Sequence, residues 1–141
     1  MTERPSITGV WDGLYIYPRI RKPVPFLAVL LGLSGALSGT TQETPKEGRS
    51  AGCIINAEIV GTHRSGSVSF RKTYLDAPHG YNRPVEYAGA LNADGTEIEG
   101  HWTIAGLLSG KFLMIRSGSM AIEQAEEKLE RIPMDAGGPL R

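Results

Sequence analysis

Two segments of the chain alternate between polar and apolar residues with a period of two. In residues 67–74 one phase holds serine, arginine and threonine, and the other holds Val68, Phe70, Lys72 and Tyr74. In residues 97–104 one phase holds glutamate, histidine and threonine, and the other holds Ile98, Gly100, Trp102 and Ile104. Successive side chains of a strand point to opposite faces, so this pattern predicts antiparallel strands with one buried face.

Shorter patterns separated by turn residues predict further strands. These strands are expected at residues 9–17, 26–33, 36–41, 53–61, 85–91 and 110–116. The Asp94-Gly95 pair predicts a hairpin turn, and the polar segment Gln42–Ser50 predicts a loop. The apolar run Val24–Leu33 is shorter than the roughly 20 residues of a membrane-spanning helix, so it is interpreted as a buried strand or strand pair.

The only helical pattern comes near the end of the chain. Apolar residues recur there at spacings of three and four, at Ile122, Ala125, Leu129 and Ile132. Ser119 is the expected N-cap and Pro133 the expected stop, so a helix is predicted at about 119–132, with a loose tail over 133–141. The predicted fold class is all-β: residues 1–141 form one domain, a closed up-and-down antiparallel barrel of about eight strands over about 8–117, with the helix packed outside.

Composition narrows the possible classes of protein. Eighteen of the 141 residues are glycine, about twice the usual ~7%, which is typical of a chain with many tight turns. Fifteen basic residues balance fifteen acidic ones, which argues against a nucleic-acid partner. A single cysteine, Cys53, excludes a disulfide scaffold and is expected to be a small buried hydrophobe. The N-terminal residues lack an apolar core after their charges, so a cytoplasmic protein without a membrane partner is expected.

The first and last predicted strands carry a short motif. Gly9-Val10-Trp11 and the terminal Arg116 resemble the signature of the calycins, the barrel group of the lipocalins, fatty-acid-binding proteins and avidins. The resemblance implies structural roles at the barrel end, with Trp11 plugging the closed end and Arg116 lying across its ring. The biotin-binding pattern of avidins is missing after Trp11-Asp12-Gly13, so biotin binding is not expected.

The inward phase of such a barrel is aromatic. Together with Lys72, its candidate ligand-binding residues are Tyr15, Tyr17, Tyr74, Tyr87, Trp102 and Phe112. The same phase holds Gly13, Gly89, Gly100 and Gly110, which either leave space for a ligand or relieve crowding between side chains.

Lys72 lies between Phe70 and Tyr74 in this phase. An ammonium there is disfavoured by desolvation unless it is paired. It is therefore interpreted either as a cation that binds a ligand carboxylate or polarises a carbonyl, or as a lysine at the barrel mouth. In the second case its ammonium reaches water or pairs with Glu86 or Glu99.

No catalytic motif, metal site or cofactor is expected, because the chain has no nucleophile elbow, no zinc motif and no phosphate-binding glycine loop. The outward phase of the first and last strands is apolar, at Val10, Leu14, Ile16, Leu113 and Ile115. We expect Ile122, Leu129 and Ile132 of the helix to cover this patch; otherwise it would be a subunit interface of a homodimer.

Three functional hypotheses follow. The first is a carrier or sensor for a small apolar ligand, with an acidic or carbonyl group, bound inside the barrel. The second is a cofactor-free cyclase or isomerase, since allene oxide cyclases resemble calycins, in which Lys72 and a tyrosine assist a reaction in a dry cavity. The third is an interaction module with a filled barrel. A barrel fold alone does not separate them.

Overall fold

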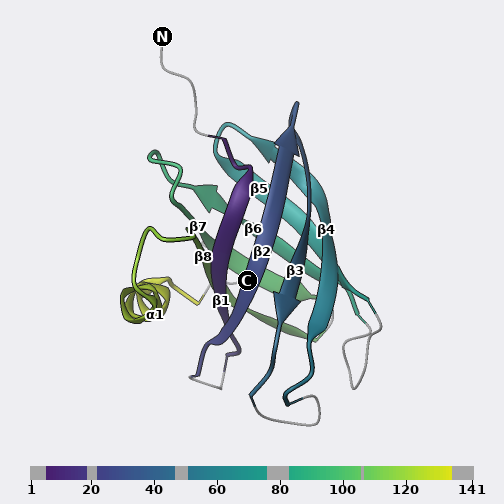
Figure 1. Cartoon of the computed structure of the whole chain (residues 1–141), viewed down its shortest axis with the longest axis vertical. Helices are drawn as coiled ribbons and strands as arrows, with labels where there is room; N and C mark the ends of the chain where they lie inside the picture. The colour runs from purple at the N-terminus through teal and green to yellow at the C-terminus, as the bar shows by residue number, and fades with distance from the viewer. Residues whose placement is uncertain (1–5, 19–21, 47–50, 76–82, 106, 135–141) are drawn as a thin grey trace, which may run out of the picture.

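The computed structural model describes residues 6–18, 22–46, 51–75, 83–105 and 107–134. It is a closed antiparallel barrel in which each strand pairs with the next and β8 returns to pair with β1 (Figure 1). The strands are β1 (Gly9–Ile16), β2 (Val24–Leu33), β3 (Ala36–Glu43), β4 (Ile55–Arg64), β5 (Ser67–Tyr74), β6 (Val85–Leu91), β7 (Glu97–Ile104) and β8 (Leu108–Arg116). The predicted fold class is confirmed.

The strand bounds agree with prediction where the alternation is cleanest, in β5, β6 and β7. In the other strands one or both ends differ from the predicted bounds by about one to three residues. Gln42 and Glu43 belong to β3 and not to the predicted loop, because they continue its pairing with β4. Cys53 precedes β4 and is exposed, so it is not the buried hydrophobe that was expected.

Tight turns join the strands at one end of the barrel. Ser34-Gly35 connects β2 to β3 and Ser65-Gly66 connects β4 to β5, each pair with positive φ at both residues. This conformation matches the twist of the flanking strands. The Asp94-Gly95 turn is also at this end. There Asn92 Oδ1 accepts hydrogen bonds from the backbone N–H groups of Thr96 and Glu97. β1, β3, β5 and β7 end at the opposite end of the barrel.

β2 is not buried on both faces, which corrects the interpretation of its apolar run as core. Its inward residues Phe26, Ala28 and Leu30 are buried. The outward residues are apolar as well, but they are 41–71% exposed; they are Leu27, Val29, Leu31 and Leu33. The outside of the barrel therefore carries an apolar stripe along β2.

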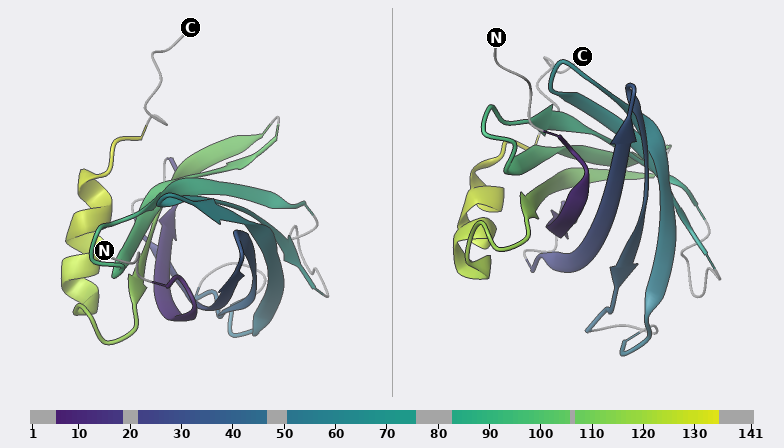
Figure 2. Two further views of the ribbon diagram at one scale, coloured as in Figure 1. Left: turned by 90° about the horizontal axis from the view of Figure 1, so that it is seen from above. Right: turned by 45° about the horizontal axis from the view of Figure 1, so that its top comes forward.

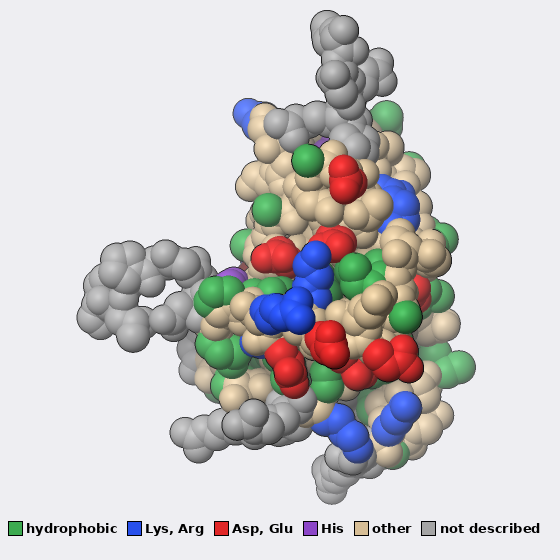
Figure 3. Space-filling model, turned by 90° about the vertical axis from the view of Figure 1, so that its left-hand side faces the viewer, with side chains coloured by type: hydrophobic (Ala, Val, Ile, Leu, Met, Phe, Trp, Pro, Cys, Tyr) green, Lys and Arg blue, Asp and Glu red, His purple; other side chains and the backbone are tan. Residues whose placement is uncertain are grey.

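The helix α1 (Ile122–Arg131) packs outside the barrel over the pairing of β1 with β8 (Figure 2). Its buried side chains meet the outward residues of both strands in a second apolar core, made of Leu14, Ile16, Leu113, Ile115, Ala125, Leu129 and Ile132. The predicted cover is thus formed by Leu129 and Ile132 with Ala125, whereas Ile122 and the patch residue Val10 are exposed. The outer surface on this side carries charges of both signs (Figure 3).

The predicted N-cap of this helix was wrong. Ala121 occupies the cap position with extended backbone and no side-chain hydrogen bond, two residues after Ser119. The predicted tail lies mostly outside the described residues, which end at residue 134. No helix in the described part of the chain is both long and apolar enough to cross a membrane.

Candidate functional site

The barrel end with the tight turns is plugged by side chains. Trp11 is buried, its indole donates to the carbonyl of Ile7 at 3.0 Å, and the Arg116 guanidinium lies 4.4 Å from its ring centroid. Arg116 also donates to the backbone carbonyls of Ser6, Thr8 and Gly95. These contacts tie the segment before β1, the last strand and a turn together, so this end is closed.

Aromatic rings fill the middle of the barrel. The Phe70 and Tyr87 rings stack with centroids 4.7 Å apart, and Phe112 meets Tyr87 edge-on at 4.9 Å. A Cβ added at Gly13 would lie 2.2 Å from Phe26, and one added at Gly110 would lie 2.6 Å from Trp102. Of the two interpretations of the inward glycines, relief of crowding therefore holds at these positions: rings occupy the space that the glycines leave.

A buried ion pair lies inside the barrel, near the end opposite the tight turns. Lys72 of β5 and Glu43 of β3 reach past the intervening strand β4 inside the barrel, and Lys72 Nζ is 3.1 Å from Glu43 Oε1. The two side chains are 1% and 0% exposed. The pairing of Lys72 with Glu86 or Glu99 suggested by the sequence was wrong: Glu86 pairs with Arg71 on the outside of the barrel, at 2.6 Å.

Tyrosine hydroxyls complete this polar cluster. Tyr15 donates to Glu43 Oε2 at 2.7 Å, and Tyr74 donates to Oε1 at 3.3 Å. Lys72 also donates to the Tyr87 oxygen at 3.3 Å, and its ammonium lies 4.8–5.5 Å from the ring centroids of Phe26, Tyr74, Tyr15 and Tyr87. Glu43 thus receives three donors, which offsets much of the cost of burying its charge.

Burial controls the protonation of the cluster. It raises the pKa of Tyr15, and the nearby Glu43 carboxylate raises that pKa further. Burial likewise raises the pKa of Tyr74 and Tyr87, although Lys72 opposes the shift. For Lys72, burial alone lowers the pKa, but the oxygens of Tyr87, Tyr74 and Glu43 outweigh it, so that the pKa is raised. At neutral pH the tyrosines are therefore protonated and Lys72 is charged.

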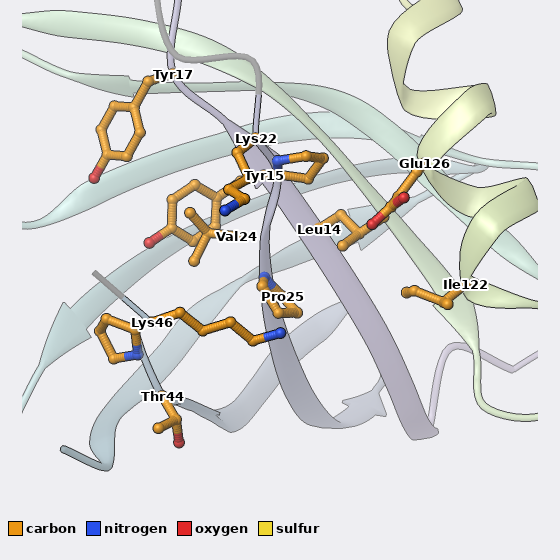
Figure 4. Close-up of a pocket in the computed structure, with 12 residues that line it drawn as sticks. Leu14, Tyr15, Tyr17, Lys22, Val24, Pro25, Thr44, Lys46, Ile122 and Glu126 are labelled. Carbon is orange, nitrogen blue, oxygen red and sulfur yellow. The ribbon is translucent and has the colours of Figure 1, made fainter. Parts of the chain in front are cut away.

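A pocket of about 620 Å³ opens at the end of the barrel opposite the tight turns (Figure 4). It extends from the ends of β1 and β3 and the start of β2 to the first turns of α1. Apolar, aromatic and charged side chains line it: Leu14, Tyr15, Tyr17, Lys22, Pro23, Val24, Pro25, Thr44, Pro45, Lys46, Ile122 and Glu126. Tyr15 belongs both to this lining and to the buried cluster, so its ring separates the pocket from the ion pair.

The structure divides the predicted ligand-binding residues into three groups. Tyr15 and Tyr17 line the pocket. Lys72, Tyr74 and Tyr87 form the cluster behind Tyr15, with the ammonium of Lys72 turned to Glu43. The remaining two are buried: Trp102 packs edge-on against Tyr17 at 5.3 Å, and Phe112 lies deeper, against Tyr87.

Three buried polar atoms have no hydrogen-bond partner among the described residues: Trp102 Nε1, Thr41 Oγ1 and His63 Nε2. Trp102 contacts side chains that line the pocket, through the rings of Tyr15 and Tyr17. Its indole is therefore an unused donor next to the pocket wall.

Sequence reasoning missed Glu43, which is central to the cluster, and also Lys46 and Glu126 at the pocket. Glu43 continues the inward alternation of Leu37 and Thr41 in β3, which was a signal for it. Lys46 and Glu126 lie on a connection and on the helix, and no strand alternation marks them.

Within the part of the chain that the structure describes, no group of three or more histidine, cysteine, aspartate or glutamate side chains is placed to hold a metal ion. Comparison with protein-family models and with curated protein sequences found no match. What the fold and the site define is therefore a closed eight-stranded antiparallel barrel with a pocket at one end.

Proposed function

We propose that the protein binds a small, largely apolar molecule in the pocket at the open end of the barrel. The observation that carries this proposal is the pocket itself: about 620 Å³ in volume, with an aromatic and aliphatic lining and a few polar groups, which is typical of a small-molecule site. The binding place differs from the inner barrel suggested by the sequence, because rings fill the space beside Gly13 and Gly110.

A calycin-like relationship belongs to the same proposal. It is supported by the contact of Arg116 with Trp11 at one end and by a pocket at the other, the arrangement that the resemblance implies. The cytoplasmic location expected from the sequence stays a prediction.

The pocket can be tested with a neutral apolar fluorophore, N-phenyl-1-naphthylamine. We expect saturable binding to the wild-type protein with one site per chain. Val24 lines the pocket and is only partly buried, so Val24→Trp should fill the pocket and weaken binding by at least about tenfold, or about 1.4 kcal/mol. Thermal melting of the variant controls for folding. Absence of saturable binding, or equal binding by a folded Val24→Trp variant, would reject the proposal.

A second candidate function, self-association, is favoured by the apolar stripe on β2. Leu27, Val29, Leu31 and Leu33 carry no charge, and Val10 extends the stripe through its pairing with Val29. The surface that best complements an uncharged apolar stripe is an identical stripe on a second copy, related by a two-fold axis.

Light scattering after size-exclusion chromatography tests this candidate. We expect a mass of about twice 15.2 kDa for the wild type and the monomer mass for Val29→Lys with Leu31→Glu. A wild-type monomer at all concentrations up to about 100 μM, well above the Kd of an ordinary dimer, would reject it.

A further inference from the structure

The pocket at the barrel mouth has an uneven distribution of charge. Lys22 and Lys46 line one part, where the connections after β1 and β3 meet, and Glu126 of α1 lines the other. Figure 4 shows Lys46 extended across the pocket toward Pro25, with Lys22 beside Tyr15 and Val24, and Glu126 near Leu14. Among the described residues, the lining therefore carries two positive side chains and one negative side chain around its apolar groups.

The buried cluster does not supply a competing charge for a ligand. Lys72 and Glu43 neutralise each other behind the Tyr15 ring, and both are almost completely buried. An acidic group that enters the pocket thus meets the lysines of the lining before it meets Lys72. The sequence suggested Lys72 as the group that binds a ligand carboxylate. For this reason that role is assigned instead to the lysines of the pocket lining.

We infer that the pocket takes an organic anion, an apolar molecule with one carboxylate, sulfonate or similar group, whose anionic head lies at Lys46 and Lys22. This inference rests on the proposed function and adds the chemical class of the ligand and its orientation. The apolar body lies against Leu14, Val24 and the Tyr15 ring. Because the body removes water from one side of the head, each lysine acts in a medium less polar than bulk water, where its attraction for an anion is stronger.

A matched pair of probes separates this inference from the proposed function. 1-Anilinonaphthalene-8-sulfonate has the skeleton of N-phenyl-1-naphthylamine with one sulfonate added. We expect the anionic probe to bind at least about tenfold more tightly, equivalent to about 1.4 kcal/mol. Its affinity should fall as NaCl is raised from 0.02 to 0.5 M (about a five-fold shorter Debye length), whereas the affinity of the neutral probe should not.

Substitutions of the charged lining residues then test which of them bind the anionic head of the probe. Lys46→Met, and more strongly Lys46→Met with Lys22→Met, should remove the preference for the sulfonate while leaving the neutral probe within about twofold, since the aliphatic stems remain. Glu126→Gln should act in the opposite direction and tighten the anionic probe. Arg64→Met is the matched control: it removes one exposed positive charge at the end of β4, next to the turn into β5 at the closed end.

Each outcome has a defined meaning. Preference for the sulfonate that is lost in the lysine variants and kept in Arg64→Met establishes the inference. Equal binding of the two probes, or a preference that survives both lysine substitutions or falls equally in Arg64→Met, overturns it while the proposed function stands. If neither probe binds, the proposed function fails and the inference fails with it.

Discussion

Lys72 and Glu43 form an ion pair at 3.1 Å inside the barrel, although they come from strands that are not hydrogen-bonded to each other. Each is the only charge compensation of the other within the described interior, because the remaining buried ionisable groups around them are tyrosines. The pair therefore links β3 and β5 in a way that backbone pairing does not.

Removing one partner of this pair should be far more costly than removing both. Lys72→Met or Glu43→Gln should lower the free energy of unfolding by about 3–5 kcal/mol, because a buried charge is left unpaired. The double variant should recover a large part of this loss, and urea unfolding at pH 7 measures it. The control is Arg71→Met at the exposed Arg71–Glu86 pair, where both side chains are about half exposed and the expected cost is below about 1 kcal/mol. Similar losses at the two pairs would contradict the buried charge.

The protein should lose stability in alkali. The pKa of Tyr15, Tyr17, Tyr74 and Tyr87 is raised by burial, and that of Lys72 is raised by the oxygens around it. Above about pH 10 the unfolded chain releases these protons while the folded chain keeps them. The free energy of unfolding therefore falls, by up to about 1.4 kcal/mol per pH unit for each group. The stabilisation is complete below pH 10 and is lost as the pH rises.

Absorbance of tyrosinate near 295 nm checks this directly. The signal of four of the five tyrosines should rise together with unfolding, and not before it, in a titration from pH 9 to 12. Tyrosinate that appears in a folded protein near pH 10, from more than one tyrosine, would show that the cluster is open to water.

The packing inside the barrel gives a third prediction. Gly13→Ala places a methyl group against the Phe26 ring and should destabilise the protein by about 1–3 kcal/mol. Adding Phe26→Leu should relieve this clash, so the double variant should be more stable than the sum of the two single effects predicts. Additive effects in a double-mutant cycle would contradict the contact.

The attachment of α1 to β8 gives a fourth prediction. Lys111 of β8 donates to the carbonyls of Glu130 and Ile132 at 2.9 and 2.7 Å, at the end of the helix where carbonyls lack helical partners. Lys111→Met should speed amide hydrogen exchange in α1 by about tenfold or more, since each hydrogen bond to a charged donor contributes about 1.5–3 kcal/mol. Exchange in β5 should change less. Arg131→Met, at the exposed pair with Glu127, should leave exchange nearly unchanged.

Particular residues show what the sequence could and could not predict. The alternation in β5 and β7 identified the inward face, and with it Lys72, because a lysine in an apolar phase stands out without any structure. Its partner was hidden, because Glu43 comes from a strand two positions away and a polar run before Pro45 reads as a loop. Local pattern reports which face a side chain occupies, but not which distant side chain it meets there.

The same reasoning explains the outcome for β2 and for the pocket. An apolar run is equally consistent with two buried faces and with one buried and one exposed face, and only the closed barrel distinguishes these cases. The pocket joins the ends of strands, a connection and the helix, so no single stretch of sequence marks it.

The position of α1 has a consequence for the order in which parts of this barrel can fold. Ser117 hydrogen-bonds Asp12 across 105 positions of sequence, and the seam between β1 and β8 is the contact that closes the ring. Every other strand pairs with its immediate successor, so the sheet can grow as the ribosome delivers it, but the seam must wait for β8. The helix that follows covers the outer side of that seam. The helix thus fastens β1 to β8, and a nascent chain halted before residue 122 would have a closing seam without its cover.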